Sequence, residues 1–180
     1  TGASSSSHVI GPVIKIGDDV FTFPLGGPVS YNPISISAPT GATSRFRGEY
    51  INQNPAIDGF NTSVKAGSFG AAQISNAGYW NIQRITGVTN VTLTLGFNTN
   101  PYEQYPVLAN LKVARWNGAQ WDDHGNGGTT ANTVVNAVAI TSYTPGYFTI
   151  AAVVSTYLFV GGQPGPGPDG SPIKLKGTGG

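Results

Sequence analysis

Residues 107–160 read VLANLKVARWNGAQWDDHGNGGTTANTVVNAVAITSYTPGYFTIAAVVSTYLFV. Apolar residues occupy alternate positions in short runs, and Asn-Gly and Pro-Gly pairs separate these runs. A period of two is the period of a strand with one buried face, and such pairs are typical of tight turns between antiparallel strands. This stretch therefore predicts a series of β-hairpins.

The segment WNGAQW at residues 116–121 is the clearest of these hairpins. An Asn-Gly pair accepts the positive φ angles that a two-residue hairpin loop demands. We expect Trp116 and Trp121 to lie opposite each other across the turn.

The rest of the chain has the same character, and no segment keeps a helical period over three turns. About ten strands with frequent turn signals favour an all-β, two-sheet antiparallel β-sandwich of immunoglobulin-like or jelly-roll-like type. Residues 53–77 lack this rhythm and are expected to form a long excursion at one end of the sandwich. Strands are expected at residues 8–16, 19–24, 33–38, 44–52, 78–86, 88–97, 107–116, 119–123, 132–141, 146–154 and 157–161.

Alternate positions on these strands predict the core, because only one face of each sheet looks inward. The core is expected to be dry and uncharged. Its predicted members are Val20, Phe21 or Phe23, Ile34, Ile36, Trp80, Ile82, Val91, Leu93, Leu95, Val113, Val138, Ile140, Phe148 and Ile150.

The domain organisation follows from a change in composition near residue 161. Residues 1–160 are assigned to the sandwich, residues 161–172 (GGQPGPGPDGSP) to a Pro/Gly-rich extended linker, and residues 173–180 to a C-terminal strand and tail. The sequence Ile173-Lys174-Leu175-Lys176 alternates like a strand but has no partner of its own. We expect it to add to a sheet of the next subunit or module, with Ile173 and Leu175 inward and Lys174 and Lys176 in solvent. Head-to-tail repetition of that contact would build a filament.

Composition excludes several classes of partner. Only 9% of residues are charged and the net charge is +1, so neither a nucleic acid nor an acidic membrane surface is an expected partner. No apolar run reaches the ~20 residues that span a bilayer. The chain has no Cys and no Met, which excludes disulfides and thiol catalysis and fits a secreted bacterial protein.

Asp122-Asp123-His124 is the one carboxylate cluster beside a histidine. With Asp18-Asp19 or Asp58 it would offer oxygen ligands to Ca²⁺. Adjacent strand residues point to opposite faces, however, so these residues are more simply interpreted as solvated hairpin side chains. No metal or cofactor is assigned, and Ca²⁺ binding at Asp122 and Asp123 is left open.

A catalytic set is not evident either. Residues 66–70 (AGSFG) differ from the nucleophile-elbow motif around Ser68 because Ala66 occupies the position of its first glycine. Only His8 and His124 are available as a base. Glu49 and Glu103 have no spacing that argues for glycosidase chemistry. The chain is therefore interpreted as a non-enzyme with no catalytic residues.

The aromatic residues offer two interpretations. Large aromatics on strands usually belong to the core, whereas exposed ones form platforms for sugar rings. Tyr102 and Tyr105 lie in the apparent loop NPYEQYP at residues 100–106, and they are the candidate ligand surface. The remaining candidates are Trp80, Trp116, Trp121, Tyr31, Tyr79, Tyr143 and Tyr147.

The arginines within strands have a simpler interpretation. Arg45 and Arg47 share a strand face, and Arg84 and Arg115 interrupt apolar runs. Ordinary cross-strand ion pairs are expected, with partners among Glu49, Asp58 and Asp122.

Five segments in a fixed order carry a resemblance: GDDVFTFPLG (17–26), YNPISISAP (31–39), YWNI (79–82), LKVARWNG (111–118) and TSYTPGYFT (141–149). Over residues 4–155 the chain resembles the β-sandwich repeats of very large secreted and cell-surface proteins of the Bacteroidota. The resemblance implies a sandwich fold, export by type IX secretion and a position at the cell surface. It implies no catalytic or binding residues. Either an excised module or a processed mature subunit agrees with it.

The sequence thus predicts a non-enzymatic extracellular structural or adhesive module, with a surface filament built by β-strand addition as its extension. Its partners are copies of itself or neighbouring modules of the same polypeptide. The alternative is a carbohydrate-binding module of a secreted polysaccharide-acting protein, with Tyr102, Tyr105 or the 53–77 loop contacting the polysaccharide.

Overall fold

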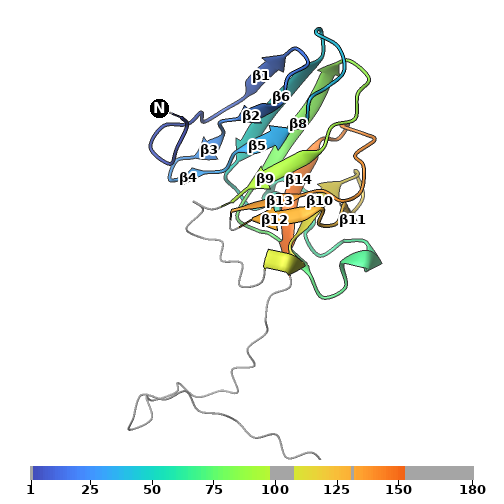
Figure 1. Ribbon diagram of the computed structural model, residues 1–180. Helices are drawn as coiled ribbons and strands as arrows, with labels where there is room; N and C mark the ends of the chain where they lie inside the picture. Colours follow the sequence, from blue (N-terminus) through green and yellow to red (C-terminus); the bar gives the residue numbers. More distant parts are fainter. Residues whose placement is uncertain (1, 98–107, 131, 153–180) are drawn as a thin grey trace, which may run out of the picture.

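A computed structural model describes residues 2–97, 108–130 and 132–152 of the chain. Within these residues the chain forms two large antiparallel sheets and a small hairpin, with three short 3₁₀ turns and no α-helix (Figure 1). The predicted all-β two-sheet sandwich is confirmed.

The larger sheet has seven strands, and β7 (Gln73–Ile74) pairs with β14 beside the main path. Along that path the order is β1 (Val13–Ile16), β6 (Arg45–Ile51), β8 (Tyr79–Thr86), β14 (Tyr147–Ala152), β10 (Lys112–Trp116) and β11 (Trp121–Asp123).

The smaller sheet has five strands. Their order is β12 (Gly128–Thr130), β13 (Thr133–Val135), β9 (Leu93–Gly96), β5 (Ile34–Ile36) and β2 (Phe21–Phe23). The hairpin consists of β3 (Gly26–Gly27) and β4 (Ser30–Tyr31), and the 3₁₀ turns are η1 (Pro55–Asp58), η2 (Gly67–Phe69) and η3 (Leu108–Asn110).

The core between the sheets follows from strand alternation, as β6 illustrates. Its sequence RFRGEYI buries every second residue, so Phe46 and Tyr50 point inward while Arg47 and Glu49 lie on the outer face. Most of the predicted core is confirmed. Its buried members are Phe23, Ile34, Ile36, Trp80, Ile82, Val91, Leu93, Leu95, Val113, Ile140, Phe148 and Ile150, joined by Leu25, Phe46, Tyr50, Phe97, Leu111, Val134 and Tyr143.

Two core predictions are wrong. Val20 is 67% exposed because it precedes the first residue of β2, and Val138 is 54% exposed because β13 has already ended at Val135. The Asn136 side chain accepts from the Leu93 N–H and donates to the Val138 carbonyl oxygen. These side-chain bonds replace the strand ladder, so alternation no longer predicts which residues face inward.

The main core cluster is apolar, as predicted, but two charged side chains are buried beside it. Lys15 is 5% exposed on β1, where its Nζ donates to the Gly17 carbonyl oxygen, and Arg115 is 8% exposed on β10. The Arg115 Nη2 donates to the Pro145 carbonyl oxygen. The expectation that the interior excludes charge is therefore wrong at these two positions.

The β10–β11 hairpin occurs where it was predicted. Trp116 and Trp121 are directly opposite, with ring centroids 5.5 Å apart. Asn117 does not have the expected positive φ; only Gly118 does, at 108°. Instead, the Asn117 Oδ1 accepts from the N–H groups of Ala119 and Gln120, so this side chain shapes the loop by hydrogen bonding.

The 53–77 excursion lies against the outer face of the larger sheet, beside β11 (Figure 1). Lys65 bridges to Trp121, because the Ala66 N–H donates to the Trp121 carbonyl oxygen and the Trp121 N–H donates to the Val64 carbonyl oxygen. A second hydrophobic cluster forms beneath it. This cluster consists of Phe69, Ala72, Ile74, Ala114, Trp116, Trp121 and Ala151, with Phe60, Ala66 and Tyr147 at its margin.

Several strand boundaries differ from the prediction. The strand expected at 8–16 begins at Val13, the one expected at 88–97 begins at Leu93, and the one expected at 132–141 shrinks to Thr133–Val135. The strands β3, β4, β7 and β12 were not predicted; each has only two or three residues. The strand expected at 157–161 lies outside the described residues.

Candidate functional site

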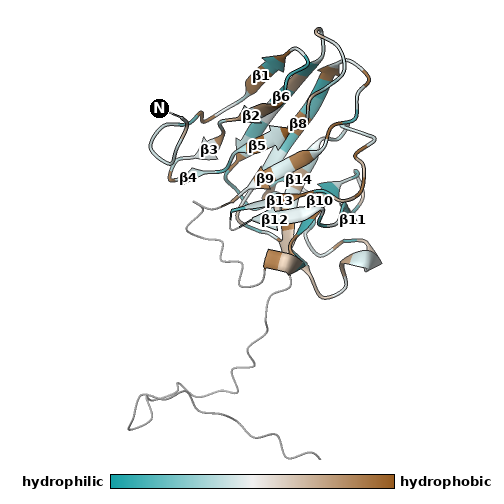
Figure 2. Ribbon diagram, viewed as in Figure 1, coloured by the Kyte–Doolittle hydropathy of each residue, from teal (hydrophilic) through white to brown (hydrophobic). Residues whose placement is uncertain are grey.

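The two sheets differ sharply in charge. The strands of the five-stranded sheet, with sequences FTF, ISI, LTLG, GTT and TVV, contain no charged residue. The seven-stranded sheet carries charged residues on β1, β6, β8, β10 and β11. In Figure 2, β12 is pale, whereas teal segments occur on β6 and β8.

Hydroxyl groups line the outer face of the five-stranded sheet. Inward positions hold the core residues, so the alternate positions hold Ser and Thr. Register aligns Thr22, Ser35 and Thr94 across three adjacent strands, and Val135 continues the row. We call this surface the hydroxyl face; it consists of Thr22, Ser35, Ser37, Thr92, Thr94, Thr130 and Thr133.

Many of these hydroxyl groups already have partners within the face. The Oγ1 of Thr22 and the Oγ of Ser35 are 2.7 Å apart, and the hydroxyl oxygens of Thr130 and Thr133 are 2.8 Å apart. The Oγ of Ser37 accepts from the Thr92 N–H at 3.0 Å. Because these groups bond to one another, covering the face leaves few of them unsatisfied.

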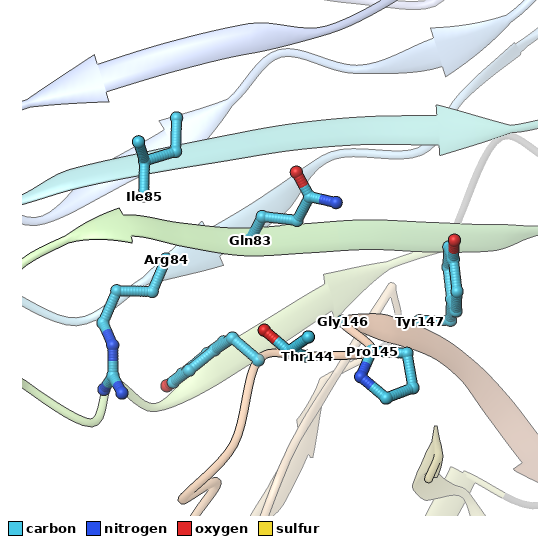
Figure 3. A pocket seen from close by; sticks show the side chains of 8 residues that line it. Gln83, Arg84, Ile85, Thr144, Pro145, Gly146 and Tyr147 are labelled. Carbon is cyan, nitrogen blue, oxygen red and sulfur yellow. The ribbon is translucent and has the colours of Figure 1, made fainter. Parts of the chain in front are cut away.

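A hollow of about 530 Å³ lies on the other sheet, between β8 and the segment that precedes β14 (Figure 3). We call it the β8 hollow. It is lined by Gln83, Arg84, Ile85, Tyr143, Thr144, Pro145, Gly146 and Tyr147.

Two groups of predicted site residues lie outside the described residues: the candidate ligand surface at Tyr102 and Tyr105, and the inter-subunit strand at Ile173, Lys174, Leu175 and Lys176.

The Asp122-Asp123-His124 cluster does not converge. Asp122 accepts from the Asn117 Nδ2 at 2.9 Å, whereas Asp123 accepts from the Lys112 Nζ at 2.6 Å on the other side of the strand. The His124 Nδ1 donates to the Val138 carbonyl oxygen at 3.1 Å. Within the described ranges, no group of three His, Cys, Asp or Glu side chains is close enough to hold a metal ion.

The near-elbow residue Ser68 lies in η2, where its carbonyl oxygen accepts from the Lys112 Nζ. Both histidines bond to backbone carbonyl oxygens elsewhere: His124 to Val138, and His8 to Ser4 and Gly27. The structure therefore does not bring Ser68 and a histidine together.

The tryptophans are buried, which agrees with the core interpretation. Trp80 is 1% exposed and Trp121 is completely buried, while Trp116 is 8% exposed. Tyr147 is only half-buried, and it lines the β8 hollow. Tyr143 lines the same hollow but is only 4% exposed, so Tyr147 is the more accessible of the two aromatic candidates there.

The arginines have varied partners. Arg47 pairs with Glu49 at 2.6 Å within one strand, not across strands as expected. Arg115 lies opposite Asp122 in the ladder; burial lowers the pKa of its guanidinium, and the Asp122 charge opposes that shift. Arg84 lies 5.0 Å from the Tyr143 ring centroid.

Burial also affects the tyrosines. Burial raises the pKa of Tyr79 strongly, and the hydrogen bond from its hydroxyl to Asp58 raises it further. Burial raises the pKa of Tyr143, whose hydroxyl bonds to the backbone of Val91. The Tyr79 hydroxyl acts as a donor, and the Tyr143 hydroxyl both accepts from the Val91 N–H and donates to the Val91 carbonyl oxygen.

The hydroxyl face was not predicted, although the sequence contains its signal. No charged residue occurs between Val20 and Ser44, and both ISIS (34–37) and TLTL (92–95) alternate apolar residues with hydroxyl residues. Asn81 and Gln83 also escaped attention, since only pairing with β6 and β14 reveals their neighbours.

Comparison with family models, with curated proteins and with solved structures gives no match for this chain. None of the described residues forms a helix with the length and apolar character needed to cross a membrane. A function is therefore inferred from the two surfaces described above.

Proposed function

We propose that the protein is a non-enzymatic structural or adhesive module that acts outside the cell. Export by the type IX route and a position on the cell surface belong to this proposal and rest on the sequence resemblance. The hydroxyl face is the single observation that supports it best.

A charge-free face suits a large contact with another surface. Burying a charged side chain costs several kcal/mol unless it is paired, and the centres of protein interfaces are depleted of charge. The hydroxyl face carries no charge and satisfies many of its own hydrogen bonds. Covering it therefore costs little desolvation energy.

Strand addition by Ile173–Lys176 remains part of the proposal, and the described sheet edges favour one acceptor. Both edges of the larger sheet are poor acceptors. Residues 64–66 already pair with the edge strand β11, and the other edge strand, β1, carries the inward Lys15, which discourages strand pairing. In the uncharged sheet the edge at β2 follows the exposed residues Asp18 and Asp19. Their carboxylates complement the charges of Lys174 and Lys176.

The alternative function, a carbohydrate-binding module that uses Tyr102 or Tyr105, remains a prediction from sequence. The hydroxyl face neither requires nor excludes it, because neutral polysaccharide is also a partner that an uncharged surface tolerates.

The adhesive proposal is tested by placing a charge at the centre of the hydroxyl face. Purified protein would be applied to cell envelopes of the source organism after deletion of its gene, and the retained protein measured. We expect Thr94→Lys to reduce retention at least about tenfold, since an unpaired buried ammonium group costs more than 1.4 kcal/mol.

Thr141→Lys is the matched control, because Thr141 is exposed in the segment before β14 and belongs to neither sheet. It adds the same charge and should leave retention unchanged. Equal retention of Thr94→Lys and the unmodified protein, with both folded, would show that this face makes no contact.

A further inference from the structure

The outer face of the seven-stranded sheet is covered over only part of its width. The 53–77 excursion covers the part at β10, β11 and the end of β14, where the second cluster is buried. The excursion also reaches the start of β8, where Phe60 and Asp58 contact the buried Tyr79. The outer positions of β6, and of β8 from Gln83 onward, have no such cover, and the β8 hollow adjoins them. The hollow thus lies where a packed cluster meets an open polar sheet.

Tyr147 stands at this boundary, and its ring is held in place by two others. Its centroid is 4.4 Å from that of Phe60, with an interplanar angle of 31°, and 5.9 Å from that of Tyr79, nearly edge-on at 80°. A ring fixed in this way presents apolar surface to a ligand with little loss of conformational entropy.

The far wall of the hollow is also fixed. The Gly146 carbonyl oxygen accepts from the Ile82 N–H at 2.7 Å, and the Pro145 carbonyl oxygen accepts from the Arg115 Nη2 at 3.0 Å. The Tyr143 hydroxyl bonds to the Val91 backbone. Three separate elements thus hold this wall, so the hollow is formed before any ligand arrives.

Polar groups line up beside the aromatic ring. Asn81 lies between Glu49 and Tyr147 in the ladder, and Gln83 lies opposite Arg47. Asn81 is 9% exposed, and its Oδ1 has no hydrogen-bond partner within the described residues. Gln83 is exposed and lines the hollow (Figure 3). Because the Asn81 Oδ1 is almost inaccessible and Asn81 does not line the hollow, the polar groups open to a ligand are the Gln83 amide and the exposed Thr144 hydroxyl, which supply both donors and acceptors.

The charge of this surface selects against an ionic ligand. Arg47 and Glu49 neutralise each other at 2.6 Å. Arg84 is already engaged, since its Nη1 donates to the carbonyl oxygens of Val88 and Thr89 and its guanidinium packs against Tyr143. A ligand here must have an apolar face for Tyr147 and a rim of neutral donors and acceptors for Gln83 and Thr144.

We propose that the β8 hollow and the adjoining outer face of β6 and β8 bind a ring of a neutral saccharide. A pyranose ring has C–H groups on its face and hydroxyl groups around its rim, which is the pattern that Tyr147, Gln83 and Thr144 complement. This site lies on the opposite sheet from the hydroxyl face and is independent of the adhesive proposal.

Amide chemical shifts of isotope-labelled protein would be followed during titration with hexasaccharides of β-1,4-linked glucose, xylose, mannose and N-acetylglucosamine. At least one is expected to shift the resonances of residues 83–85 and 143–147 in a saturable way. Two further titrations, one with a hexamer of glucuronic acid and one with inorganic phosphate, test whether the hollow prefers an anionic ligand.

Gln83→Ala should weaken binding of the same hexasaccharide about fivefold to tenfold, because it removes hydrogen bonds without touching the core. Tyr147→Ala should abolish it, whereas Tyr147→Phe, which keeps the ring, should stay within about threefold. Tyr31→Ala is the control, since Tyr31 is half-buried on β4, away from the hollow.

The proposal is overturned if no neutral hexasaccharide shifts these resonances, if glucuronic acid or phosphate binds more tightly, or if Gln83→Ala binds unchanged. Gln83→Ala should leave retention on cell envelopes unchanged, and Thr94→Lys should leave saccharide binding unchanged. The two measurements therefore test the adhesive proposal and the saccharide proposal separately.

Discussion

The indole Nε1 of Trp80 donates a hydrogen bond of 2.8 Å to the carbonyl oxygen of Asn32, inside the sandwich. Trp80 belongs to β8 of the larger sheet, and Asn32 lies between β4 and β5, two residues before the first residue of β5 in the smaller sheet. The bond is completely buried, and the ring also packs against Tyr50 at 5.2 Å. One side chain thus fills the core and ties the two sheets together.

Trp80→Ala should lower the free energy of unfolding by about 3–5 kcal/mol, because it leaves a large cavity. Trp80→Phe retains most of the volume but leaves the Asn32 carbonyl oxygen without its donor, so a loss of about 1–3 kcal/mol is expected. Denaturant unfolding measures both. A Trp80→Ala protein with unchanged stability would contradict the central position of this ring.

Gly146→Ala should destabilise the fold, because a Cβ at this position would lie 1.9 Å from the Ile82 carbonyl oxygen. The segment would have to move away from β8, at a cost of about 1–3 kcal/mol. Gly67→Ala is the control, since nothing lies within 4 Å of a Cβ there and its φ is not positive. Equal melting temperatures for the two variants would show that the close approach is not required.

Two ion pairs of equal length should contribute differently to the free energy of unfolding. Lys112–Asp123 and Arg47–Glu49 are both 2.6 Å long, but the Asp123 side chain is 8% exposed and the Glu49 side chain 26%. Asp123 also accepts from the Gly125 N–H. Asp123→Asn should therefore cost about 1–3 kcal/mol and Glu49→Gln less than about 1. Chemical denaturation at low and high salt compares them, and the reverse order would refute this ranking.

Stability should fall in alkaline solution. Tyr79 and Tyr143 have raised pKa values in the folded state, so folding favours their neutral forms. Their contribution is complete below the unfolded value of about 10 and is lost as pH rises through the folded values. Melting temperatures above pH ~10 should decline less steeply in Tyr79→Phe. A curve parallel to that of the unmodified protein would contradict the assignment.

Deletion of residues 171–180 should abolish assembly and leave the sandwich folded, if Ile173–Lys176 adds to a neighbouring sheet. Replacing Asp18 and Asp19 by Lys should weaken the same assembly, because like charges would then meet at β2. Sedimentation and electron microscopy measure both effects. Multimers that survive the deletion unchanged would rule out strand addition.

Local sequence was sufficient for some features of this protein. A strand was predicted at residues 44–52, where β6 lies, and the turn residues of WNGAQW predicted the β10–β11 hairpin, because strands have a period of two and tight turns need particular residues. Alternation failed at Val138, where the Asn136 side chain ends the strand through contacts with β9 that are distant in sequence.

By itself, the sequence determined the fold class, the identity of most core residues and the low charge, since these depend on composition and on spacing along one strand. Only the tertiary structure decided that charge is sorted between two sheets, that the 53–77 excursion covers part of one outer face, and that Asn81 lies between Glu49 and Tyr147. Strand order and register set these neighbours. They join residues tens of positions apart, and no local period encodes such pairings.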